Sequence, residues 1–586
     1  MRAGEALLDL DGFGGRLAFG APRRIVEAWS PAEVRPALEA VEAAARGGAW
    51  AVGFVAYEAA SAFDPALRTH PPAAGVPLVW FGVHDEARGA RPRASGEAQL
   101  GPLLPDVAEP TYRAAVERLR EAMAAGVAYQ VNHTFRLRGP FSGDPLALYE
   151  RLRAAQGGGL SACLSLGDRA LVSASPELFL ATRGRRVVAR PMKGTARRGR
   201  FLEEDQAAAA RLAGSEKERA ENVMIVDLLR NDLGRVAVPG TVEVTALCQV
   251  ERYRTVLQLT STVEAELRPD AGLWSLLSAA FPCGSVTGAP KASAMGLIAA
   301  AEPTPRGVYC GAVGVVAPGG DATFNVAIRT VWLDLARGEA VAGVGGGITF
   351  ASSAEAEWQE ALAKGAFLSA PPPPDFALLE TLRLEDGRYP RLDGHLARLI
   401  ASARHLERAV DAARVRAALE AEAAAAGPGA WRVRLTVGAD GRPVVERAPA
   451  PAPPEGPAPV ALARQPVSSR DPFLFHKTTW REPYERARRE APPGLFDVLL
   501  WNEAGQLTEF TIGNVVLDLE GERVTPPREA GLLGGVFRAE LLARGEVRER
   551  PLPIEVLGRA RAVWLVNALR GWVPVRLEAA RQGTGV

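Results

Sequence analysis

The chain places its apolar residues in two distinct patterns. Residues 49–58 (AWAVGFVAYE) and 311–317 (GAVGVVA) are almost continuously apolar and rich in β-branched or aromatic residues, which predicts strands. Residues 111–126 (TYRAAVERLREAMAAG) carry apolar side chains at helical spacing, which predicts a helix. Both halves of the chain mix the two patterns. We therefore expect an α/β (α+β) fold throughout.

Four consecutive prolines interrupt these patterns near the middle of the chain. Proline cannot continue a helix or a central strand, so this stretch favours an extended spacer. A chain of 586 residues is also too long for one hydrophobic core. We expect a first domain over residues 1–368, a linker over 369–375 and a second domain over 376–586. A further proline- and alanine-rich stretch, residues 447–460, predicts two lobes in the second domain.

Composition narrows the range of functions. The chain has 69 basic and 68 acidic residues and a net charge of +1, so electrostatics give no reason to expect a nucleic acid or a membrane surface as partner. The first residues lack the apolar run of a signal peptide, and no stretch approaches the roughly 20 apolar residues of a membrane span. The four cysteines form no C-x-x-C pair, which argues against a disulfide framework or a structural zinc site. A cytoplasmic location is expected.

Two predicted helices of the first half carry carboxylates in unusual places. In residues 216–236, Glu221 lies four residues before Ile225, on the apolar face. A carboxylate there is costly unless it is paired, binds a cation or reaches solvent at the helix end, and the sequence leaves these alternatives open.

The second such helix is expected just before the prolines. Ser352 and Glu355 fit a capping box, which predicts that the helix begins there. Three polar residues then follow along one face at spacings of three and four: Glu357, Glu360 and Lys364. A few carboxylate oxygens that leave room for a substrate are what Mg²⁺ prefers.

Lys193 lies in residues 190–198 (RPMKGTARR), directly after a strand-like run. A solvated surface lysine and an amine held in a pocket for chemistry both fit this local sequence. Between a further predicted strand and the helix of Glu357, the chain has three consecutive glycines, residues 345–347. Glycines at such a place would let backbone N–H groups approach an anion closely.

Taken together, these motifs resemble those of the chorismate-utilising enzymes, a family that includes anthranilate synthase, isochorismate synthase and the large subunit of aminodeoxychorismate synthase. The resemblance spans most of residues 45–368 and implies large sheets wrapped by helices around one deep pocket. The motifs are SPELF (175–179), PMKGT (191–195), RAENVMIVDLLRNDLGRV (219–236), GSVTGAPKASAM (284–295), YCGAVG (309–314), AIRT (327–330), GGGI (345–348) and EAEWQEALAK (355–364).

The resemblance also implies the residues of the site. Mg²⁺ would be held by Glu221 and Glu360, with Glu357 close by. The groups implied in substrate binding are Thr287, Tyr309, Arg329, Lys364 and the backbone of Gly345, Gly346 and Gly347.

Lys193 distinguishes between members of this family. Anthranilate synthases carry alanine at this place, whereas lysine is typical of aminodeoxychorismate synthases. There the amine attacks ring carbon 2 of chorismate, the 4-hydroxyl leaves, and ammonia enters at carbon 4 and expels the lysine. The amine must be unprotonated, so its pKa must fall from about 10.4. By the same resemblance Glu177 protonates the leaving hydroxyl. Gln258 stands where many members have histidine and cannot act as a base.

The second half has its own unusual residues. Residues 376–406 predict a strand, a turn, a second strand and then a helix with His395 and Arg398 among leucines, where the arginine can also simply extend to water. Lys477 lies beside an apolar run, and Glu509 lies in β-rich, apolar surroundings.

Residues 525–542 place a glycine turn before a helix. The free N–H groups at such a helix start suit a phosphate, although an ordinary loop-to-helix junction also fits.

The chain has a lysine, a buried acid and a glycine turn suited to a phosphate (the phosphate cradle, residues 525–542), in this order. This arrangement resembles that of the class IV aminotransferases, which include branched-chain and D-amino acid aminotransferases and aminodeoxychorismate lyase. The resemblance covers nearly all of residues 376–586 and implies a two-lobed, fold-type IV pyridoxal 5′-phosphate domain. Trp480 replaces an asparagine common in the family. By this resemblance Lys477 bonds to the cofactor and Glu509 contacts its ring nitrogen, while the phosphate is held by Arg398 and the backbone of Val536 and Phe537.

The two resemblances together imply a bifunctional enzyme of folate biosynthesis. The first half would convert chorismate to 4-amino-4-deoxychorismate, and the second would remove pyruvate to give 4-aminobenzoate. None of the four cysteines lies in a glutaminase nucleophile motif, so ammonia would come from solution or from a separate glutamine amidotransferase subunit. Class IV relatives suggest a homodimer. The alternatives are an anthranilate synthase-like enzyme fused to a true aminotransferase, and an inert binding protein.

Overall fold

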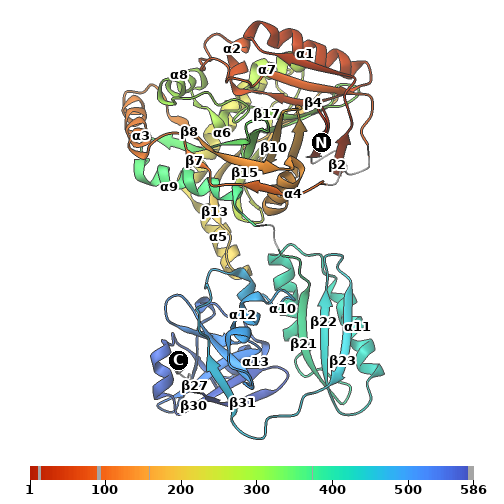
Figure 1. Cartoon of the computed structure of the whole chain (residues 1–586), viewed down its shortest axis with the longest axis vertical. Helices are drawn as coiled ribbons and strands as arrows, with labels where there is room; N and C mark the ends of the chain where they lie inside the picture. The colour runs from red at the N-terminus through yellow and green to blue at the C-terminus, as the bar shows by residue number, and fades with distance from the viewer. Residues whose placement is uncertain (11–14, 89–93, 158, 372–373, 579–586) are drawn as a thin grey trace. The chain divides into compact units, whose positions relative to one another are not determined.

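A computed structural model describes the chain except for residues 11–14, 89–93, 158, 372–373 and 579–586 (Figure 1). It consists of two compact units. The first is Met1–Arg197 with Ala209–Pro373, and the second is Arg198–Ala208 with Pro374–Val586. From sequence alone, residues 198–208 belong with the first domain, but in the structure they pack within the second unit.

The first unit contains two large antiparallel sheets. One has the order β16 (Gly288–Ala289), β8 (Gln130–Gly143), β20 (Glu339–Thr349), β19 (Thr330–Asp334), β10 (Arg169–Ser175), β9 (Leu160–Ser165), β1 (Ala6–Leu10) and β2 (Gly15–Phe19), with β6 (Ala98–Leu100) and β7 (Leu104–Pro105) paired to β8. The other has the order β13 (Met192–Arg197), β15 (Val256–Glu266), β12 (Arg186–Arg190), β11 (Leu178–Arg183), β18 (Ala322–Val326), β17 (Ala312–Val316), β4 (Trp50–Val55), β5 (Val79–His84) and β3 (Arg24–Ala28), with β14 (Glu243–Arg252) paired to β15.

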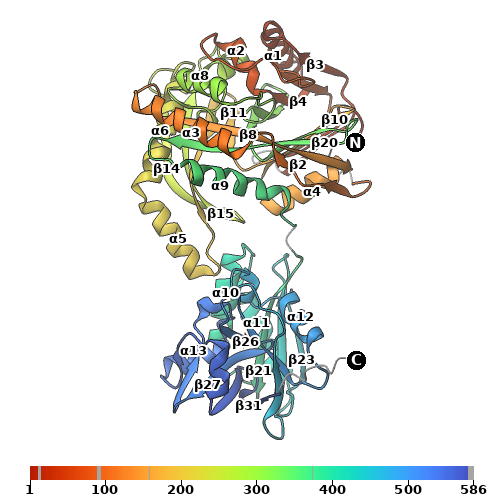
Figure 2. The same cartoon turned by 60° about the vertical axis from the view of Figure 1, so that its left-hand side comes forward.

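These two sheets share a core and carry helices on their other faces. On β4, Val52 and Phe54 pack with Leu171 of the first sheet, whereas Ala51 and Val55 point into the helix-covered core. Alternate side chains of β4 are therefore buried on both faces, which explains its unbroken apolar sequence. The packed helices, several of which are seen in Figure 2, are α1 (Pro31–Arg46), α2 (Ala60–Phe63), α3 (Glu109–Ala124), α4 (Pro145–Gln156), α6 (Glu216–Gly234), α7 (Leu273–Ala280), α8 (Lys291–Ala301) and α9 (Ala354–Lys364). Of helix α5 (Leu202–Gly214), residues 202–208 belong to the second unit and residues 209–214 to the first.

The second unit contains one small sheet and one larger mixed sheet. The small sheet has the order β21 (Leu378–Glu385), β22 (Ala430–Val437) and β23 (Pro443–Pro449) and packs with α10 (Leu392–His405) and α11 (Ala412–Ala425). The larger sheet has the order β26 (Leu507–Phe510), β25 (Asp497–Trp501), β24 (Ala458–Leu462), β31 (Gly571–Leu577), β30 (Ala562–Asn567), β27 (Gly513–Leu519), β28 (Glu522–Thr525) and β29 (Arg548–Glu549), with α12 (Glu482–Glu490) and α13 (Val536–Ala543) packed beside it.

The mixed α/β class expected from the sequence is confirmed, but three local expectations are wrong. Helix α9 is capped by Ser353, one residue later than predicted, and Ser352 instead donates a hydrogen bond from its hydroxyl to Glu357. The glycines 345–347 lie inside β20 and pair with β8, rather than after the strand. The second strand expected after β21 is reduced to one bridge between Glu385 and Arg388.

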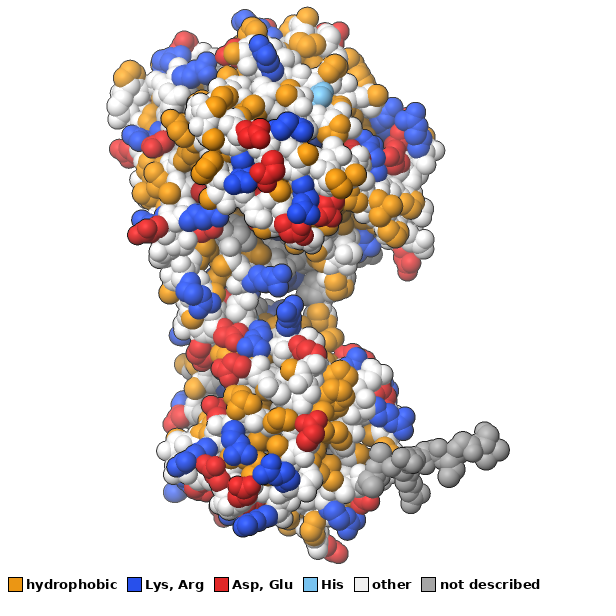
Figure 3. Space-filling model, turned by 90° about the vertical axis from the view of Figure 1, so that its left-hand side faces the viewer, with side chains coloured by type: hydrophobic (Ala, Val, Ile, Leu, Met, Phe, Trp, Pro, Cys, Tyr) orange, Lys and Arg blue, Asp and Glu red, His pale blue; other side chains and the backbone are white. Residues whose placement is uncertain are grey.

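Charged side chains of both signs share the surface, as the balanced composition suggests. Basic and acidic side chains are interspersed on the face shown in Figure 3. All four cysteines are buried free thiols. Within the described ranges, no helix is both long enough and apolar enough to cross a membrane.

Candidate active sites

Lys193 lies where strand β13 departs from regular pairing with β15. The register shifts between Met192 and Thr195, and Gly194 has a φ of +100°, a conformation that suits glycine. The Lys193 side chain is only 17% exposed, and its Nζ lies 3.5 Å from Oε2 of Glu221 on α6. Burial lowers the pKa of Lys193, although the Glu221 carboxylate acts in the opposite direction. The irregular strand thus presents a buried amine with a lowered pKa.

The glycines of β20 leave room for this amine. A Cβ atom on Gly347 would lie 2.4 Å from Lys193 Nζ and 2.2 Å from Gln130 Nε2. A Cβ atom on Gly346 would lie 3.1 Å from Glu357 Oε2 and 3.4 Å from Lys364 Nζ. Side chains from three separate segments therefore converge on this part of β20, and any larger residue would displace them.

The carboxylates of α9 face the same glycines. Glu360 lies 2.8 Å from the Lys364 ammonium, which also donates to the Gly345 carbonyl at 3.0 Å. Burial favours the protonated form of Glu360, but Lys364 lowers its pKa. Burial raises the pKa of Glu357, and the repulsion from Glu360 adds to this effect. A cation would relieve that repulsion.

Across the described residues, however, no group of three or more His, Cys, Asp or Glu side chains is placed to hold a metal ion. Glu221 and Glu360 are instead paired with lysines, at 3.5 and 2.8 Å. The trio expected to bind Mg²⁺ is not preassembled as a metal site. The assignment of Mg²⁺ to these residues stays a prediction.

Glu177 is the buried acid of this site. It immediately precedes β11 and is only 3% exposed. Burial raises its pKa to about 7, while hydrogen bonds from the Ser285 hydroxyl and the Met192 N–H, together with Lys193, act against the rise. The Met192 N–H lies 3.4 Å from its Oε1. Glu177 can therefore carry a proton near neutral pH, next to the residue that precedes Lys193.

Three residues expected to bind substrate make other contacts. The Thr287 hydroxyl donates to the Cys283 carbonyl at 3.1 Å. Tyr309 is partly buried, with the Arg136 guanidinium 5.1 Å from its ring centre. The Arg329 guanidinium donates to Gln156, and burial lowers its pKa to about 10. Their substrate roles stay predictions.

Two residues of this site were not singled out from the sequence. Asn222 donates from its side chain to the carbonyls of Lys193 at 3.0 Å and Leu259 at 3.1 Å, and so ties α6 to the lysine strand. Gln130 reaches Gly347 from β8. Asn222 directly follows Glu221 in the sequence, which was a usable signal, whereas Gln130 comes close only through the pairing of β8 with β20. Gln258 accepts a hydrogen bond from the Thr195 hydroxyl at 2.9 Å.

Lys477 marks a second site, in the other unit. Its chain segment is fixed by a hydrogen bond from the Leu379 N–H to the Lys477 carbonyl at 2.9 Å. Burial and the nearby cations Arg398 and Arg481 together lower the pKa of its amine to about 8, against the opposite effect of Glu380 and Glu509. The amine is therefore partly neutral near neutral pH.

Arg398 is held on α10 by a buried carboxylate. Its Nε donates to Glu380 at 2.9 Å, and its NH1 donates to the Gly534 carbonyl at 3.2 Å. His395 lies 2.7 Å from the same Glu380, and these partners lower the pKa of Glu380 to about 2 against the effect of burial. Gly534 is next to Gly535, the N-cap of α13, so a fixed cation stands at the start of a helix. That combination suits a phosphate.

Glu509 is the third element of this site. It accepts hydrogen bonds from the Tyr484 hydroxyl at 2.8 Å, the Leu533 N–H at 3.0 Å and the Asn514 amide at 3.2 Å. Burial nevertheless raises its pKa to about 7. Lys477 and Arg481 lower its pKa less than burial raises it. A buried acid of raised pKa close to Lys477 fits a protonated ring nitrogen, and the residues fit the cofactor. Tyr484 and Asn514 were not anticipated.

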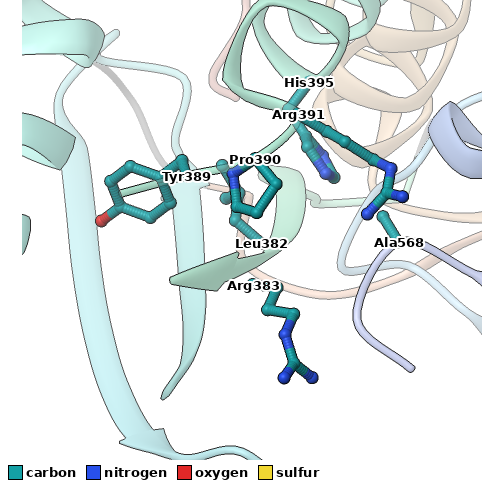
Figure 4. Close-up of a pocket in the computed structure, with 7 residues that line it drawn as sticks. All are labelled: Leu382, Arg383, Tyr389, Pro390, Arg391, His395 and Ala568. Atoms are coloured by element: carbon teal, nitrogen blue, oxygen red, sulfur yellow. The ribbon is translucent and has the colours of Figure 1, made fainter. Parts of the chain in front are cut away.

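A small pocket lies near these residues but does not contain Lys477. Its lining is Leu382, Arg383, Tyr389, Pro390, Arg391, His395 and Ala568 (Figure 4). Through His395 it adjoins the Glu380 carboxylate that holds Arg398. We therefore place the cofactor site by Lys477, Arg398 and Glu509, and not by this pocket.

Comparison with known proteins identifies a family for each half of the chain. Residues 10–370 match the chorismate binding enzyme family, and residues 377–577 match class IV aminotransferases. Aminodeoxychorismate synthase component 1 of Salmonella typhimurium is 43% identical over 251 residues, which are 42% of this chain and 55% of that protein. Anthranilate synthase component 1 of Streptomyces coelicolor is also 43% identical, over 267 residues, which are 45% of this chain and 52% of that protein.

The chain thus spans about half the length of these curated relatives. Among solved structures, anthranilate synthase component I from Streptococcus pneumoniae superposes with a TM-score of 0.54 at 27% identity, covering 61% of this chain and 93% of that one. Equal identity to both kinds of synthase means that overall similarity does not choose between their reactions. The chain belongs to the chorismate binding enzyme family and carries a class IV aminotransferase domain after its chorismate-binding part.

Proposed function

We propose that this chain aminates chorismate to 4-amino-4-deoxychorismate and then eliminates pyruvate to form 4-aminobenzoate. The observation that carries the proposal is Lys193, a buried amine of lowered pKa with a protonatable acid, Glu177, beside its strand. An anthranilate synthase, which has alanine at this place, needs no such amine.

In the first reaction the neutral Lys193 amine attacks ring carbon 2 of chorismate. The ring double bond shifts, and the 4-hydroxyl leaves as water after taking the proton of Glu177. Ammonia then adds at carbon 4, the double bond shifts back, and the bond between carbon 2 and Lys193 breaks. The electron pair of that bond returns to the nitrogen and leaves Lys193 as a neutral amine. The proton lost by the added ammonia returns to Glu177, so the enzyme ends unchanged. A pKa of about 7 for Glu177 suits the donation of this proton near neutral pH.

We assign Mg²⁺ to Glu221 and Glu360, with Glu357 nearby. A cation there would compete with Lys193 and Lys364 for the carboxylates, since the lysines lie 3.5 and 2.8 Å from them. Release of Lys193 from Glu221 would remove the interaction that raises its pKa. In this proposal the metal therefore also favours the neutral nucleophile.

In the second reaction Arg398 and the start of α13 would hold the phosphate of pyridoxal 5′-phosphate, and Glu509 would hold its ring nitrogen. The bound cofactor supplies an electron sink for the carbon that bears the substrate amine. Lys477 would remove the proton from carbon 4 of the substrate, and the enolpyruvyl group would leave from carbon 3 and take up a proton as pyruvate. A pKa of about 8 leaves part of Lys477 neutral for this task.

The proposal also covers the source of ammonia, the cellular location and the oligomeric state. The relatives named component 1 imply a second component, so we propose that a separate glutamine amidotransferase subunit supplies ammonia to this chain. We also propose a cytoplasmic enzyme that forms a homodimer through its second unit.

Product identification tests the proposal. Chorismate, ammonia and Mg²⁺ should give 4-aminobenzoate and pyruvate when the protein is loaded with pyridoxal 5′-phosphate. Anthranilate as the aromatic product would instead support the alternative, an anthranilate synthase-like domain joined to a true aminotransferase.

A further inference from the structure

The second unit contains a segment that comes from the first half of the sequence. Arg198–Ala208 follows the lysine strand β13 directly, yet it packs with residues 374–586. Phe201 is only 5% exposed and lies in an apolar cluster with Leu474, Phe475 and Tyr484. Its ring centre is 5.3 Å from that of Phe475. Phe201 is thus part of the core beneath the segment that carries Lys477.

Arg200 adds polar contacts around the same segment. Its NH1 donates to the carbonyls of Ser469 at 3.1 Å and Glu529 at 2.8 Å. Its guanidinium carbon lies 4.9 Å from the ring centre of Phe475. The guanidinium therefore joins the loop before the 3₁₀ turn Pro472–Leu474 to the 3₁₀ turn Arg528–Ala530, which precedes the glycines of the phosphate cradle.

The backbone of Arg200 reaches the residue next to Lys477. The Arg200 carbonyl lies 3.2 Å from Nε2 of His476, and His476 Nδ1 lies 3.0 Å from the Ser402 hydroxyl on α10. Burial lowers the pKa of His476 to about 3, so its ring is neutral. Because a carbonyl can only accept, Nε2 carries the hydrogen and Nδ1 accepts from Ser402. His476 is therefore held from both sides, by Arg200 and by the helix of Arg398.

We infer that Arg200 and Phe201 are positioning residues for Lys477. They fill the core under Phe475 and fix the ring of His476, so that the following residue presents its amine toward Glu509 and Arg398. The inference rests on the proposed role of Lys477 in binding pyridoxal 5′-phosphate. It assigns to the segment Arg198–Ala208 a part in the cofactor site that its position in the sequence does not suggest.

The test uses the full-length chain with the variants Arg200→Ala, Phe201→Ala and the milder Phe201→Leu. Arg211→Ala, an exposed arginine later in α5, is the matched control. The readouts are the equilibrium binding of pyridoxal 5′-phosphate and the pH midpoint of the visible absorbance of the lysine-bound cofactor. We expect Arg200→Ala and Phe201→Ala to weaken cofactor binding by about tenfold or more and to shift the midpoint by about half a pH unit. Phe201→Leu should give smaller changes of the same sign, and Arg211→Ala none.

Cofactor binding and a pH midpoint that match the wild type in Arg200→Ala and Phe201→Leu would overturn the inference. Phe201→Leu keeps an apolar side chain in the core, so it remains informative if Phe201→Ala does not fold. The proposed function fails differently. A wild-type chain that binds the cofactor at Lys477 but forms no 4-aminobenzoate would contradict the function and leave the positioning role in place.

Discussion

Lys193 and Lys477 are both buried amines with lowered pKa values, but their surroundings differ. Lys193 faces a carboxylate, Glu221, which opposes the effect of burial. At Lys477 the cations Arg398 and Arg481 reinforce the effect of burial more than Glu380 and Glu509 oppose it, and its pKa falls to about 8. Loss of the Glu221 partner would therefore lower the pKa of Lys193 further, whereas Lys477 is already partly neutral near neutral pH.

The amination step should depend on the protonation of Glu177. Because this residue donates a proton, turnover at saturating chorismate should fall as the pH rises through about 7, the pKa that burial gives it. The measurement is the initial rate of aminodeoxychorismate formation against pH, with the concentration of free ammonia held constant. A rate that stays level through this range would contradict the assignment of Glu177 as the acid.

The same residue should limit stability at higher pH. Its pKa of about 7 in the folded state exceeds the ordinary value of 4.5. Between these two pH values the folded state binds more protons than the unfolded state, so the free energy of unfolding falls as the pH rises from about 4.5 to about 7. Glu177→Gln removes this loss. The variant should be more stable than the wild type by on the order of 1–3 kcal/mol at about pH 8, with no such gain at about pH 4.

Urea denaturation at the two pH values measures this difference. The gain at the higher pH should come without amination activity, since glutamine carries no proton to donate. Equal differences at both pH values would mean that Glu177 is not a buried acid.

At the scale of elements, strand β20 shows what local sequence can and cannot reveal. Continuous apolar runs and helical spacing were enough to predict β4, β17 and α3. The glycines of β20 were expected in a loop, because a run of glycines looks like a turn when its partners are unknown. Their pairing with β8, which brings Gln130 to Gly347, is a contact between distant segments that no local pattern encodes.

The candidate site residues also fall into two groups, those that local sequence brings together and those that only the fold brings together. Those within one motif, such as Glu357, Glu360 and Lys364, come together as helical spacing predicts. Lys193 and Glu177 become neighbours only because β11 and β13 belong to one sheet, and this was inferred from family resemblance and not from spacing. The acids and glycines around Lys477 likewise depend on pairing between strands far apart in the chain.

Gly347→Ala should disable the first reaction without unfolding the protein. The added Cβ would lie 2.4 Å from Lys193 Nζ and 2.2 Å from Gln130 Nε2, and these flexible side chains must move away. We expect kcat for amination to fall by on the order of a hundredfold, since misplacement by about 1 Å has effects of this size. Gly296→Ala on α8, where a Cβ meets nothing within 4 Å, is the control and should retain activity. Unchanged kcat in Gly347→Ala would contradict the placement of Lys193.

At the scale of the whole molecule, the chain carries two separately built sites. Composition and the proline stretch were enough to expect two domains, and the two family resemblances match residues 10–370 and 377–577. The packing of Arg198–Ala208 within the second unit could not be predicted, because the segment is mostly polar and the partners of its buried Phe201, such as Leu474 and Phe475, lie far away in the sequence.

If the two sites act independently, variants that lack one lysine each should complement one another when the two proteins are mixed. Lys193→Ala should lower formation of 4-aminobenzoate from chorismate by on the order of a thousandfold or more, yet it should leave turnover of supplied aminodeoxychorismate unchanged. Lys477→Ala should do the reverse. A mixture of the two proteins should regain 4-aminobenzoate formation from chorismate after a lag, monitored by its fluorescence. Absence of recovery would show that the intermediate does not pass between separate chains.

The most direct test of the central claim is a search for the covalent bond to Lys193. The protein is incubated with chorismate and Mg²⁺ without ammonia, quenched with acid and analysed by intact-mass measurement and peptide mapping. We predict an adduct with the mass of chorismate less one water, located on Lys193, absent from Lys193→Ala and present in Lys477→Ala. A chain that consumes chorismate in the presence of ammonia but never carries this adduct on Lys193 would contradict the account.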